Sequence, residues 1–538
     1  MNTISKLVKK AEKAMSSGRF KDAIEHLDEL LNRSPNELRY LMMRGEAYLR
    51  IENHEAGLVD YAKVVEAEPQ NITALVNFAA ALIRCNKQSD AKDILEYVLE
   101  LDSNSFDAHI NLCNIYQTLG NSEASLKLAL KAIQIRPGSY IAYNNLGTAL
   151  SDLNMIDEAR EAYITANLIE PNYVATIINL AQIEIKSSNH LRGIELYENA
   201  LQLNNITSNE AELVKYYLGY AYLFIGEIGK GWDYYENGFG SLLPAAARRS
   251  NRRFLEPQWN GEPLGDKVLL IWREQGLGDE IEFATCLHDV AQSGVQVILE
   301  CEPRLVNIFK RTFPAFKVRR ESIGPDLLPS LKDFDVQCAV GSLPRIYRRT
   351  IECFAKDITP LVLLESSVEN FKKRLSGYHG KKLVGICWRS GLFSILRNLN
   401  YTALLDWKEL LLQQDFQFVN LQYGDCESEL IQIEAALGIQ ILRWSDLDLK
   451  NDLENVLGLI KNLDAVVTVG TAVSSLAASC DVPTYLLTHQ SWLMLGQTVH
   501  YPWYKSVVPL IAAKNEHLAE KIKLIPDLIK KSEKGKFS

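Results

Sequence analysis

The first 240 residues repeat with a period of 34 residues, and this period limits the folds that they can adopt. Four prolines and one serine fall on a single grid of that spacing: Pro35, Pro69, Ser103, Pro137 and Pro171. Small residues recur on the same period in two series, offset by twelve residues: Gly45, Ala79, Cys113, Gly147 and Ala181, and Ala23, Gly57, Ala91, Ser125, Ala159 and Gly193. Small residues let two helices approach closely, and proline ends a helix. The period therefore predicts an array of paired helices.

One segment of the array, NNLGTALSDLNMIDEAREAYITANLIEP at residues 144–171, resembles the tetratricopeptide repeat. This resemblance implies six repeats over about residues 4–205 and a divergent seventh that contains Gly219, Tyr222 and Gly231. We expect an all-α superhelix over residues 1–240. Arrays of this kind bind polypeptides, so we expect a protein partner.

A second ladder with the same period consists of asparagines, each two residues before the small position of its repeat: Asn77, Asn111, Asn145 and Asn179. The spacing places them on the first helix of each pair, and first helices line the concave face of such a superhelix. An asparagine amide both donates and accepts hydrogen bonds, so a column of amides can hold a peptide backbone whatever its side chains. We expect these residues to bind an acceptor peptide; the alternative is that they connect neighbouring repeats.

Composition excludes several classes of protein. At 538 residues the chain is too long for one ordinary core, and its 47% hydrophobic and 23% charged residues are globular values. The net charge of -9 and the lack of a long basic run argue against nucleic acid as a partner. The nine cysteines include no C-x-x-C pair, which favours reduced thiols over a disulfide framework or a zinc site. Without a visible signal peptide or a long apolar run, we expect a soluble, cytoplasmic protein with no membrane span.

The pattern changes after residue 240. Residues 241–264 form a linker that is basic at first and then rich in proline and glycine. Short apolar runs then alternate with helical patterns, at residues 267–272, 295–301, 334–340, 383–388, 416–422, 439–444, 465–469 and 484–488. Such runs predict parallel sheets covered on both faces. A polar stretch near residues 360–382 divides them, so we expect an α/β region of two Rossmann-like halves, 265–370 and 371–538, the second with a final helix near 515–533.

The turn after the first predicted strand is a candidate site, because open α/β sheets bind ligands beyond the carboxyl ends of their strands. The segment WREQGLGDEIEF places Gly276 and Gly278 just before Asp279, where a helix begins. The alternative interpretation of Asp279 is a helix cap. Ile281 occupies the place of the third glycine of a dinucleotide fingerprint, and this argues against NAD.

The turn after the run at 465–469 predicts an anion site, with an ordinary strand–helix turn as the alternative. It consists of small and hydroxyl residues before an alanine-rich helix: Gly470, Thr471, Ala472, Val473 and Ser474. Free N–H groups and the positive end of the helix dipole favour phosphate there. Arg389 and Ser390 follow the run at 383–388, and Arg389 and Arg397 could neutralise a phosphate or a sugar carboxylate. His500, which begins HYPWY, is a further candidate wall of the donor pocket.

Six segments together resemble a known family: EQGLGDEIEFA, ICWRSG, RNLNYTALLDW, FVNLQYGD, VGTAVSSLAA and HYPWY. They are similar to the glycosyltransferase-like domain of bacterial tetratricopeptide-repeat proteins, which is related to the heptosyltransferases of GT-B fold, and the resemblance covers about residues 255–512. It implies an α/β GT-B-like domain, a nucleotide-sugar donor and no bound metal. The D-x-D-like pair Asp446 and Asp448 is therefore expected to be a solvated helix start.

The resemblance also implies residue roles. Asp279 matches the aspartate that serves heptosyltransferases as general base, and Thr471, Ala472 and Val473 match their donor-phosphate loop. Gly470 departs from the family, which has aspartate there, and this argues against ADP-heptose as the donor. We expect Asp279, with Glu274 as a second carboxylate, to take the proton of an acceptor hydroxyl.

Proteins with this combination of domains include flagellin glycosyltransferases, whose repeats engage flagellin. We therefore expect a protein O-glycosyltransferase that moves a sugar to Ser or Thr of an acceptor, with flagellin as the leading candidate. By analogy, the donor is a CMP-linked nonulosonic acid, which is a co-substrate, and no cofactor is expected. The alternative is a non-catalytic scaffold that binds a client or a nucleotide through a decayed transferase domain.

Overall fold

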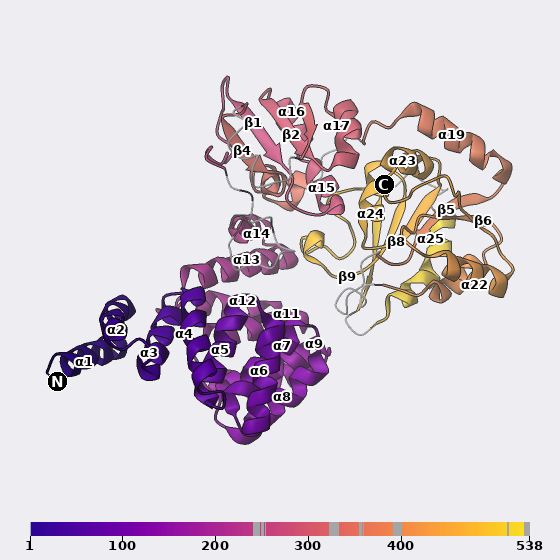
Figure 1. Ribbon diagram of the computed structural model, residues 1–538. Coiled ribbons are helices and arrows are strands. Elements are labelled where there is room, and N and C mark those ends of the chain that lie inside the picture. The colour runs from indigo at the N-terminus through magenta and orange to yellow at the C-terminus, as the bar shows by residue number, and fades with distance from the viewer. Residues whose placement is uncertain are drawn as a thin grey trace. The chain divides into compact units, whose positions relative to one another are not determined.

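The computed structural model describes residues 2–239, 248, 252, 254–321, 333–354, 358, 360–390, 401–513 and 516–531. The chain divides into two compact units, Met1–Ser187 and Ser188–Ser538 (Figure 1). The described elements of the first unit are all helices, whereas the second unit combines helices with two parallel sheets. The predicted order of an all-α array followed by an α/β region is confirmed.

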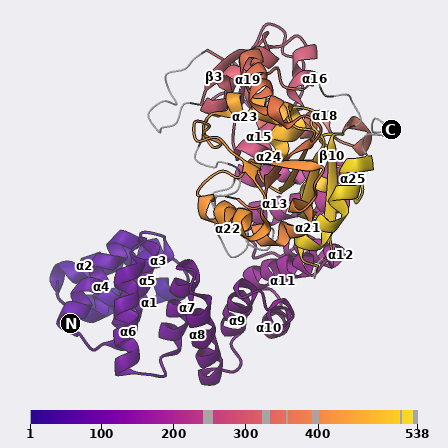
Figure 2. The same ribbon diagram turned by 90° about the vertical axis from the view of Figure 1, so that its right-hand side faces the viewer.

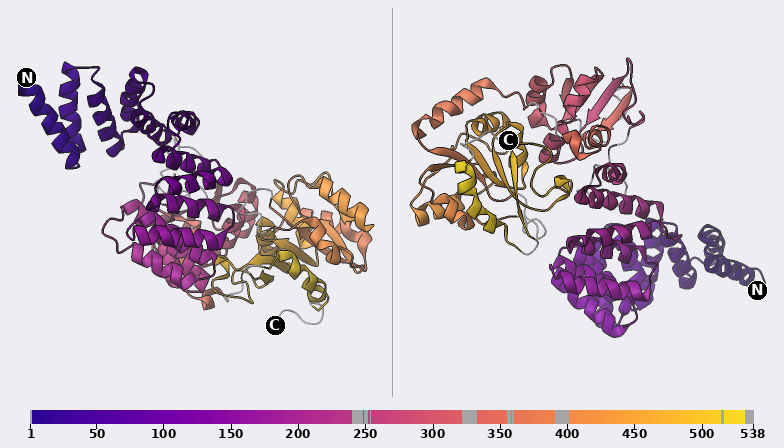
Figure 3. Two further views of the ribbon diagram at one scale, coloured as in Figure 1. Left: turned by 90° about the horizontal axis from the view of Figure 1, so that it is seen from below. Right: turned by 180° about the vertical axis from the view of Figure 1, so that it is seen from behind.

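The first unit is a stack of helix pairs, as the 34-residue period predicts (Figures 1 and 3). Its helices are α1 (Asn2–Ser16), α2 (Phe20–Arg33), α3 (Leu38–Arg50), α4 (His54–Ala67), α5 (Ile72–Arg84), α6 (Gln88–Leu101), α7 (Phe106–Thr118), α8 (Ser122–Ile135), α9 (Tyr140–Asp152), α10 (Ile156–Ile169) and α11 (Val174–Lys186). The small positions lie where paired helices meet. A Cβ on Gly45 would lie 2.9 Å from the ring of Tyr61, and one on Gly147 would lie 2.6 Å from the ring of Tyr163. These glycines therefore make room for an aromatic ring of the second helix.

The turn inside each helix pair follows the same period. Residues with positive φ recur at 34-residue intervals: Gly18, Glu52, Asn86, Gly120, Asn154 and Ser188. This left-handed conformation ends one helix and starts the next, and glycine and asparagine adopt it at the least cost. The backbone thus repeats together with the sequence.

The second unit begins with the last helices of the array: α12 (His190–Ala200), α13 (Ser208–Ile225) and α14 (Ile228–Tyr235). Their aromatic side chains share a hydrophobic core with the first sheet, because Tyr216, Trp232 and Tyr235 belong to the same buried cluster as Ile271. The indole of Trp232 also donates a hydrogen bond of 3.0 Å to the carbonyl oxygen of Arg348. The compact units therefore divide after residue 187, whereas the sequence pattern of the array continues to about residue 240.

The first Rossmann-like half contains a four-stranded parallel sheet with the order β3-β2-β1-β4. Its elements are β1 (Val268–Trp272), α15 (Leu277–Ala284), α16 (Leu287–Gln292), β2 (Gln296–Cys301), α17 (Val306–Thr312), β3 (Lys317–Arg320), β4 (Val336–Ala339) and α18 (Leu343–Tyr347). Strand β3 was not predicted, because its sequence KVRR lacks the apolar run of a central strand. It lies at the edge of the sheet, where polar side chains are tolerated.

The second half contains a six-stranded parallel sheet with the order β10-β9-β8-β5-β6-β7. Its elements are α19 (Glu365–Leu375), β5 (Lys382–Cys387), α21 (Lys408–Leu411), β6 (Phe416–Asn420), α22 (Glu427–Leu437), β7 (Ile441–Leu442), α23 (Leu453–Lys461), β8 (Ala465–Val469), α24 (Ala472–Ser479), β9 (Thr484–His489), β10 (Val507–Ala512) and α25 (Ile525–Lys531). Counted from β5, this is the order 3-2-1-4-5-6 of doubly wound nucleotide-binding sheets. Strand β10 was also not predicted; it contains Pro509, which sheets accept at an edge.

Helices α19 and α25, at the two ends of the second half in the sequence, both pack within this half. Helix α19 packs beside α23 (Figures 1 and 2), so the chain after about residue 364 belongs to the second half. In the final helix, Ile525 and Ile529 join the core formed by Val384 and its neighbours, and Lys382 donates a hydrogen bond of 3.3 Å to the carbonyl oxygen of Ile529. The last described helix, α25, therefore packs on the second Rossmann-like half, to which it belongs.

Candidate active site

The two turns that the sequence singles out lie at the topological switch points of the two sheets. Strand β1 lies between β2 and β4, and β5 lies between β6 and β8, so the order of each sheet reverses at its first strand. Residues 273–276 follow β1, and Gly470 and Thr471 follow β8. Ligands of open α/β sheets bind outside the carboxyl ends of the strands at such points.

The two turns contact each other through helices α15 and α24. A Cβ on Gly278 would lie 3.6 Å from the Cα of Ala472 and 3.4 Å from Oγ of Ser475. A side chain longer than alanine at position 278 would enter this contact. The structure therefore brings together the beginnings of two helices that lie almost 200 residues apart in the sequence.

Glu274 lies in a buried ion-pair network. Its carboxylate accepts hydrogen bonds from the guanidinium of Arg248, one of them 2.8 Å long. Arg248 also donates to Oγ of Ser342 over 2.6 Å and to Glu236 over 2.9 Å. Burial raises the pKa of Glu274, and the charge of Arg248 opposes this effect. The network fixes the turn after β1 to the end of α14 and to the turn after β4.

Glu280 lies in a second buried network, centred on Arg273. The Nε of Arg273 donates to Glu280 over 2.8 Å, and its Nη1 lies 3.0 Å from Glu302 and 3.2 Å from Glu321. Burial raises the pKa of Glu280 to about 7, against the opposing charge of Arg273. These charged side chains therefore fix the loop and are enclosed by the protein.

Asp279 differs from the glutamates around it. They are almost fully buried: Glu274 is 1% exposed, Glu280 2% and Glu282 3%. The side chain of Asp279 is partly exposed, at the third position of α15, and the N-cap Gly276 supplies no side-chain cap. Burial raises the pKa of the Tyr501 hydroxyl, and the charges of Glu282 and Asp279 add to this. Asp279 is thus the partly exposed carboxylate of residues 272–284, all of which are described.

The turn after β8 presents hydroxyl groups. Thr471 is the N-cap of α24, and its Oγ1 accepts a hydrogen bond of 3.3 Å from the N–H of Val473. Oγ of Ser474 donates to the carbonyl oxygen of Thr471 over 2.6 Å, and the first turn of α24 contains no acidic residue. Gly470 is exposed, and a Cβ there would meet none of the described atoms within 4 Å. This turn keeps the chemistry of an anion site, with room for a side chain at 470.

Arg389 follows β5 but already has acidic partners. Its Nε donates to Glu429 over 3.1 Å, its Nη2 also contacts that carboxylate, and Nη2 donates to the carbonyl oxygen of Asp425 over 2.7 Å. The hydrogen bonds to Glu429 raise the pKa of Arg389 further. Oγ of Ser390 lies 3.3 Å from the hydroxyl of Tyr423. Arg389 therefore holds the loop after β6, and Arg397 lies outside the described residues.

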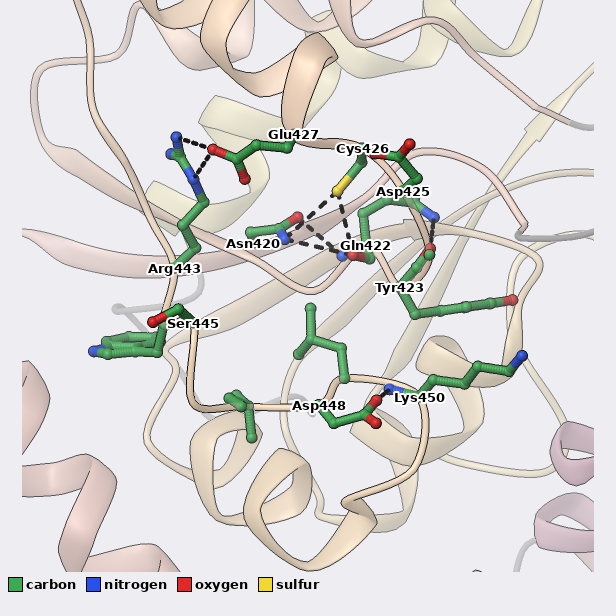
Figure 4. A pocket seen from close by; sticks show the side chains of 14 residues that line it. Asn420, Gln422, Tyr423, Asp425, Cys426, Glu427, Arg443, Ser445, Asp448 and Lys450 are labelled. Atoms are coloured by element: carbon green, nitrogen blue, oxygen red, sulfur yellow. Dashed lines mark hydrogen bonds and ion pairs between the residues drawn. The ribbon is translucent and has the colours of Figure 1, made fainter.

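A cavity of about 590 Å³ opens beside this loop, at the carboxyl ends of β6 and β7 (Figure 4). Aromatic and charged side chains line it, including Tyr423, Asp425, Trp444 and Lys450. Figure 4 shows the side chains of Tyr423 and Lys450 extending toward the same side of the cavity. Its volume and its mixture of rings and polar groups suit a small ligand with an aromatic part, such as a nucleoside.

The D-x-D-like residues both have protein partners. Asp446 forms an ion pair of 2.7 Å with Arg374. Asp448 accepts a hydrogen bond of 2.9 Å from the backbone N–H of Lys450 (Figure 4). It also accepts one of 3.0 Å from the backbone N–H of Asn451. In the part of the chain that the structure describes, no group of three or more His, Cys, Asp or Glu side chains could hold a metal ion.

The HYPWY segment joins the second half to α15. The Tyr501 hydroxyl donates to Glu282 over 3.0 Å, and the Tyr504 hydroxyl donates to the carbonyl oxygen of Ile281 over 3.0 Å. Trp503 is fully buried in the core. His500 is exposed at the start of this segment. The aromatic residues therefore pack the two halves together.

Two asparagines of the ladder connect neighbouring repeats. Nδ2 of Asn145 donates to Oδ1 of Asn114 over 2.8 Å, and Nδ2 of Asn179 donates to Oδ1 of Asn144 over 3.1 Å. Each hydrogen bond joins the first helices of successive pairs. At Asn145 and Asn179, direct contacts thus support the alternative to peptide binding, in which the asparagines connect neighbouring repeats.

The other two asparagines are partly exposed on their helices. Asn77 lines a groove of about 630 Å³ together with Met42 and Met43 of α3. A hydrogen bond between Asn77 and the Tyr61 hydroxyl slightly offsets the effect of burial, which raises the pKa of Tyr61. The groove combines this amide and two flexible apolar side chains with charged residues, Glu37, Arg39, Glu46 and Glu68, a mixture that suits a peptide with apolar and charged side chains.

Reasoning from the sequence missed three features of the site. Arg248 belongs to a basic stretch that reads as a linker, so its buried pairing with Glu274 was not expected. Trp444 and the cavity at β7 were also missed, because β7 was assigned only as a strand. Glu282 had a visible signal, because it is an acid within the otherwise apolar run that begins at Ile281.

Comparisons with known proteins agree with the repeat array. Tetratricopeptide-repeat family models match residues 8–72 and 140–173. Protein FlbA of Caulobacter vibrioides is 28% identical over 478 residues, which are 86% of this chain and 73% of FlbA. The Homo sapiens Protein O-mannosyl-transferase TMTC1 is 24% identical over 163 residues, 30% of this chain and 18% of that protein. The crystal structure of MamA protein covers 32% of this chain and 93% of its own, with 24% identity and a TM-score of 0.29.

None of the described helices combines the length and apolarity that a membrane crossing requires.

The matches to TMTC1 and MamA cover about a third of the chain, whereas the match to FlbA covers most of it. The chain therefore contains tetratricopeptide repeats and is similar over most of its length to Protein FlbA.

Proposed function

We propose that this chain is a protein O-glycosyltransferase of GT-B type, which transfers a sugar from a nucleotide sugar to a hydroxyl of a protein held by the repeats. One observation carries the proposal: the turn after β1 contacts the turn after β8. The contact joins a partly exposed carboxylate to a hydroxyl-rich helix N-terminus at the switch points of two parallel sheets. A transferase needs these two groups together, one for the acceptor proton and one for the leaving phosphate.

The electrostatics of the two turns support this division of roles. Asp279 occupies the first turn of α15, where its negative charge repels an anion, whereas Glu280 in the same turn is paired with Arg273. The first turn of α24 has no acidic residue, and Thr471 and Ser474 surround its N-terminus with hydroxyls. A phosphate is therefore more stable at α24, where the positive end of the helix dipole is not opposed by carboxylates.

The reaction follows from this arrangement. The carboxylate of Asp279 accepts the proton of the acceptor hydroxyl while the hydroxyl oxygen forms a bond to the anomeric carbon of the donor. The bond between that carbon and the phosphate oxygen breaks, and the phosphate leaves with the electron pair. Backbone N–H groups at the start of α24 stabilise the negative charge on it. The buried networks of Glu274 and Glu280 keep the loop rigid during the transfer.

The nucleoside of the donor occupies the cavity at the ends of β6 and β7. The hydrogen bond from Arg389 to Asp425 and the one between Ser390 and Tyr423 connect the wall of this cavity to the switch point of the sheet. Trp444 and Tyr423 offer ring faces for a base, and Asp425 offers a carboxylate near the ribose. Gly470 removes the carboxylate that heptosyltransferases have at this position and leaves open space there, in keeping with a donor that carries its own carboxylate, such as a CMP-linked nonulosonic acid.

The acceptor binds the repeats, and we propose flagellin as that acceptor. The groove beside Asn77 supports a peptide partner, as does the general use of tetratricopeptide arrays. The name of TMTC1 contains O-mannosyl-transferase, but the match covers only 18% of that protein and supports only the repeats. FlbA, which matches most of this chain, is the more informative relative for further work.

The proposal is tested with the purified full chain. Calorimetric titration with CMP, UDP, GDP and ADP should show that one nucleotide binds. Incubation with flagellin and a CMP-linked nonulosonic acid should increase the intact mass of flagellin by whole sugar units. Flagellin from cells that lack this protein should also be lighter than flagellin from cells that contain it.

The scaffold alternative gives a different result in the same experiments. A decayed transferase domain binds a nucleotide but leaves the mass of flagellin unchanged in vitro and in cells. Binding of none of the four nucleotides, together with an unchanged mass, would remove the donor assignment as well. The titration and the mass measurement thus separate the two functions.

A further inference from the structure

Glu282 lies at the contact between the two Rossmann-like halves, one helical turn after Asp279. Its Oε1 accepts a hydrogen bond of 2.9 Å from the Ser475 hydroxyl and one of 3.0 Å from the Tyr501 hydroxyl. Glu282 belongs to α15 of the first half, and both donors belong to the second half. A single carboxyl oxygen therefore connects the halves through two separate segments.

The surroundings of Glu282 stabilise its neutral form. The side chain is 3% exposed, and its Oε2 has no hydrogen-bond partner among the described residues. Burial raises the pKa of Glu282 to about 8, while the hydrogen bonds from Ser475 and Tyr501 lower it in part. No basic side chain contributes to the shift, unlike at Glu274 and Glu280. Glu282 thus acts as a hydrogen-bond acceptor between the halves and not as half of an ion pair.

The geometry relates this link to both sides of the proposed site. Residues three apart on a helix lie on neighbouring parts of its surface, so Glu282 follows Asp279 along α15 and Ser475 follows Ala472 along α24. The hydrogen bond between Glu282 and Ser475 therefore lies one turn behind the contact of Gly278 with Ala472. Together the two contacts fix both the separation and the register of the two helix starts.

We infer that Glu282 is a positioning residue, which holds the base Asp279 at the correct distance from the donor-phosphate turn on α24. This inference rests on the proposed function. Glu282 does not touch the substrates; it acts through the packing of α15 on α24. Such a residue affects the chemical step more than the binding of the nucleotide, because the nucleotide is held by the second half alone.

The test measures transfer and nucleotide binding in the full chain with the Glu282→Ala, Glu282→Gln, Ser475→Ala and Tyr501→Phe variants. We expect Glu282→Ala to lower kcat for transfer to flagellin about 10- to 100-fold, the usual scale for a misplacement near 1 Å, and to leave the CMP affinity within about threefold. Glu282→Gln should recover most of kcat, because its amide oxygen still accepts both hydrogen bonds. Ser475→Ala and Tyr501→Phe should each give a smaller loss than Glu282→Ala.

A second arm separates positioning from a general loss of structure. In the Asp279→Asn background, the Glu282→Ala substitution should lower kcat less than threefold further, because it acts through the base that is already gone. Equal losses in both backgrounds, or a folded Glu282→Ala variant with normal kcat, would overturn the inference. If Glu282→Ala does not fold, the same comparison is made with Ser475→Ala and Tyr501→Phe, each in the wild-type and in the Asp279→Asn background. If the wild-type chain transfers no sugar, the proposed function itself is overturned. This outcome differs from failure of the inference, because no kcat of the wild type can then be measured.

Discussion

The turn after β1 and the turn after β8 have the same backbone plan, a parallel strand followed by an eight-residue helix, but opposite chemistry. The first turn of α15 carries two carboxylates and its N-cap is glycine, whereas α24 begins with a threonine N-cap and has no acid in its first turn. Charges at a helix N-terminus change the stability of a bound anion by about 0.3–1 kcal/mol each. The same architecture thus begins with an acidic first turn on one side and with a first turn that has no acid on the other.

Burial adds a second difference between the turns. On the α15 side, Arg248 and Arg273 enclose Glu274 and Glu280 in ion pairs, and only Asp279 among these acids is partly exposed. On the α24 side, the exposed position is Gly470, which has no side chain. The accessible position is therefore a carboxylate on one side and a glycine on the other.

The largest effect is expected for Asp279→Asn. This variant cannot accept the hydroxyl proton, so kcat for transfer to flagellin should fall by roughly 10²–10⁴-fold. The melting temperature should change little, because the helix loses one charge–dipole interaction of about 0.3–1 kcal/mol. CMP affinity, measured by calorimetry, should be unchanged since the phosphate lies on the α24 side.

Near-normal turnover in Asp279→Asn would mean that this partly exposed carboxylate supports α15 and does not act on the substrate. Glu280→Gln is a poor control, because it breaks a buried ion pair. Glu302→Gln is more suitable, because its ion pair with Arg273 lies at a partly exposed position and not in the interior.

Adding a carboxylate to the α24 turn should make it resemble the α15 turn. Gly470→Asp has room for its side chain and should weaken nucleotide binding about tenfold, or about 1.4 kcal/mol, by repelling the phosphate. The matched control is Gly470→Asn, which has nearly the same shape without the charge and should bind CMP within about threefold of the wild type. Equal affinities of the Asp and Asn variants would place the phosphate elsewhere.

The buried acids of α15 predict a dependence of stability on pH. Burial raises the pKa of Glu280 to about 7 and that of Glu282 to about 8, so the folded state holds more protons than the unfolded state between about pH 4.5 and 8. The free energy of unfolding should therefore decrease as pH rises through this window, by up to about 1.4 kcal/mol per pH unit for each proton. Glu282→Gln should flatten the upper part of this dependence, because glutamine does not titrate.

Thermal unfolding of the full chain and of Glu282→Gln, measured at half-unit steps of pH, checks this expectation. The wild type should lose more stability than the variant between about pH 6.5 and 8.5. Parallel curves would indicate that Glu282 is ionised across this range and that its environment is more polar than its burial suggests.

The smallest expected effect is that of chelation. The positive field at α24 comes from backbone N–H groups, so excess EDTA should leave the rate of transfer unchanged within about twofold. Loss of activity that magnesium or manganese restores would contradict this, and would direct attention to Asp446 and Asp448 despite their contacts with Arg374 and Asn451.

The array and the two parallel sheets could be predicted because they depend on local patterns. The 34-residue period of small residues reflects direct contacts such as Gly147 with Tyr163, and continuous apolar runs mark strands that are covered on both faces. The edge strands β3 and β10 carry no such mark, since edges accept the arginines of KVRR and the proline of VVPLIA.

The candidate site was predictable only in part. The positions of the two turns follow from strand–turn–helix patterns, but their contact depends on tertiary packing between Gly278 and Ala472. Glu274 and Arg389 look like exposed functional residues in the sequence; their partners Arg248 and Glu429 lie 26 and 40 residues away and are not marked by any local motif. Long-range pairing of charges decides which ionisable side chains remain exposed to a substrate.

The central claim is that phosphate binds the turn after β8 and the base lies on the turn after β1. It is tested most directly by a crystal structure of the full chain with whichever of CMP, UDP, GDP and ADP binds most tightly. The terminal phosphate of the nucleotide should accept hydrogen bonds from the backbone N–H groups of Thr471 and Ala472. The base of the nucleotide should lie in the cavity beside Trp444. A phosphate held by the N–H groups of Gly276–Gly278 at the start of α15, with Thr471 unoccupied, would contradict the account.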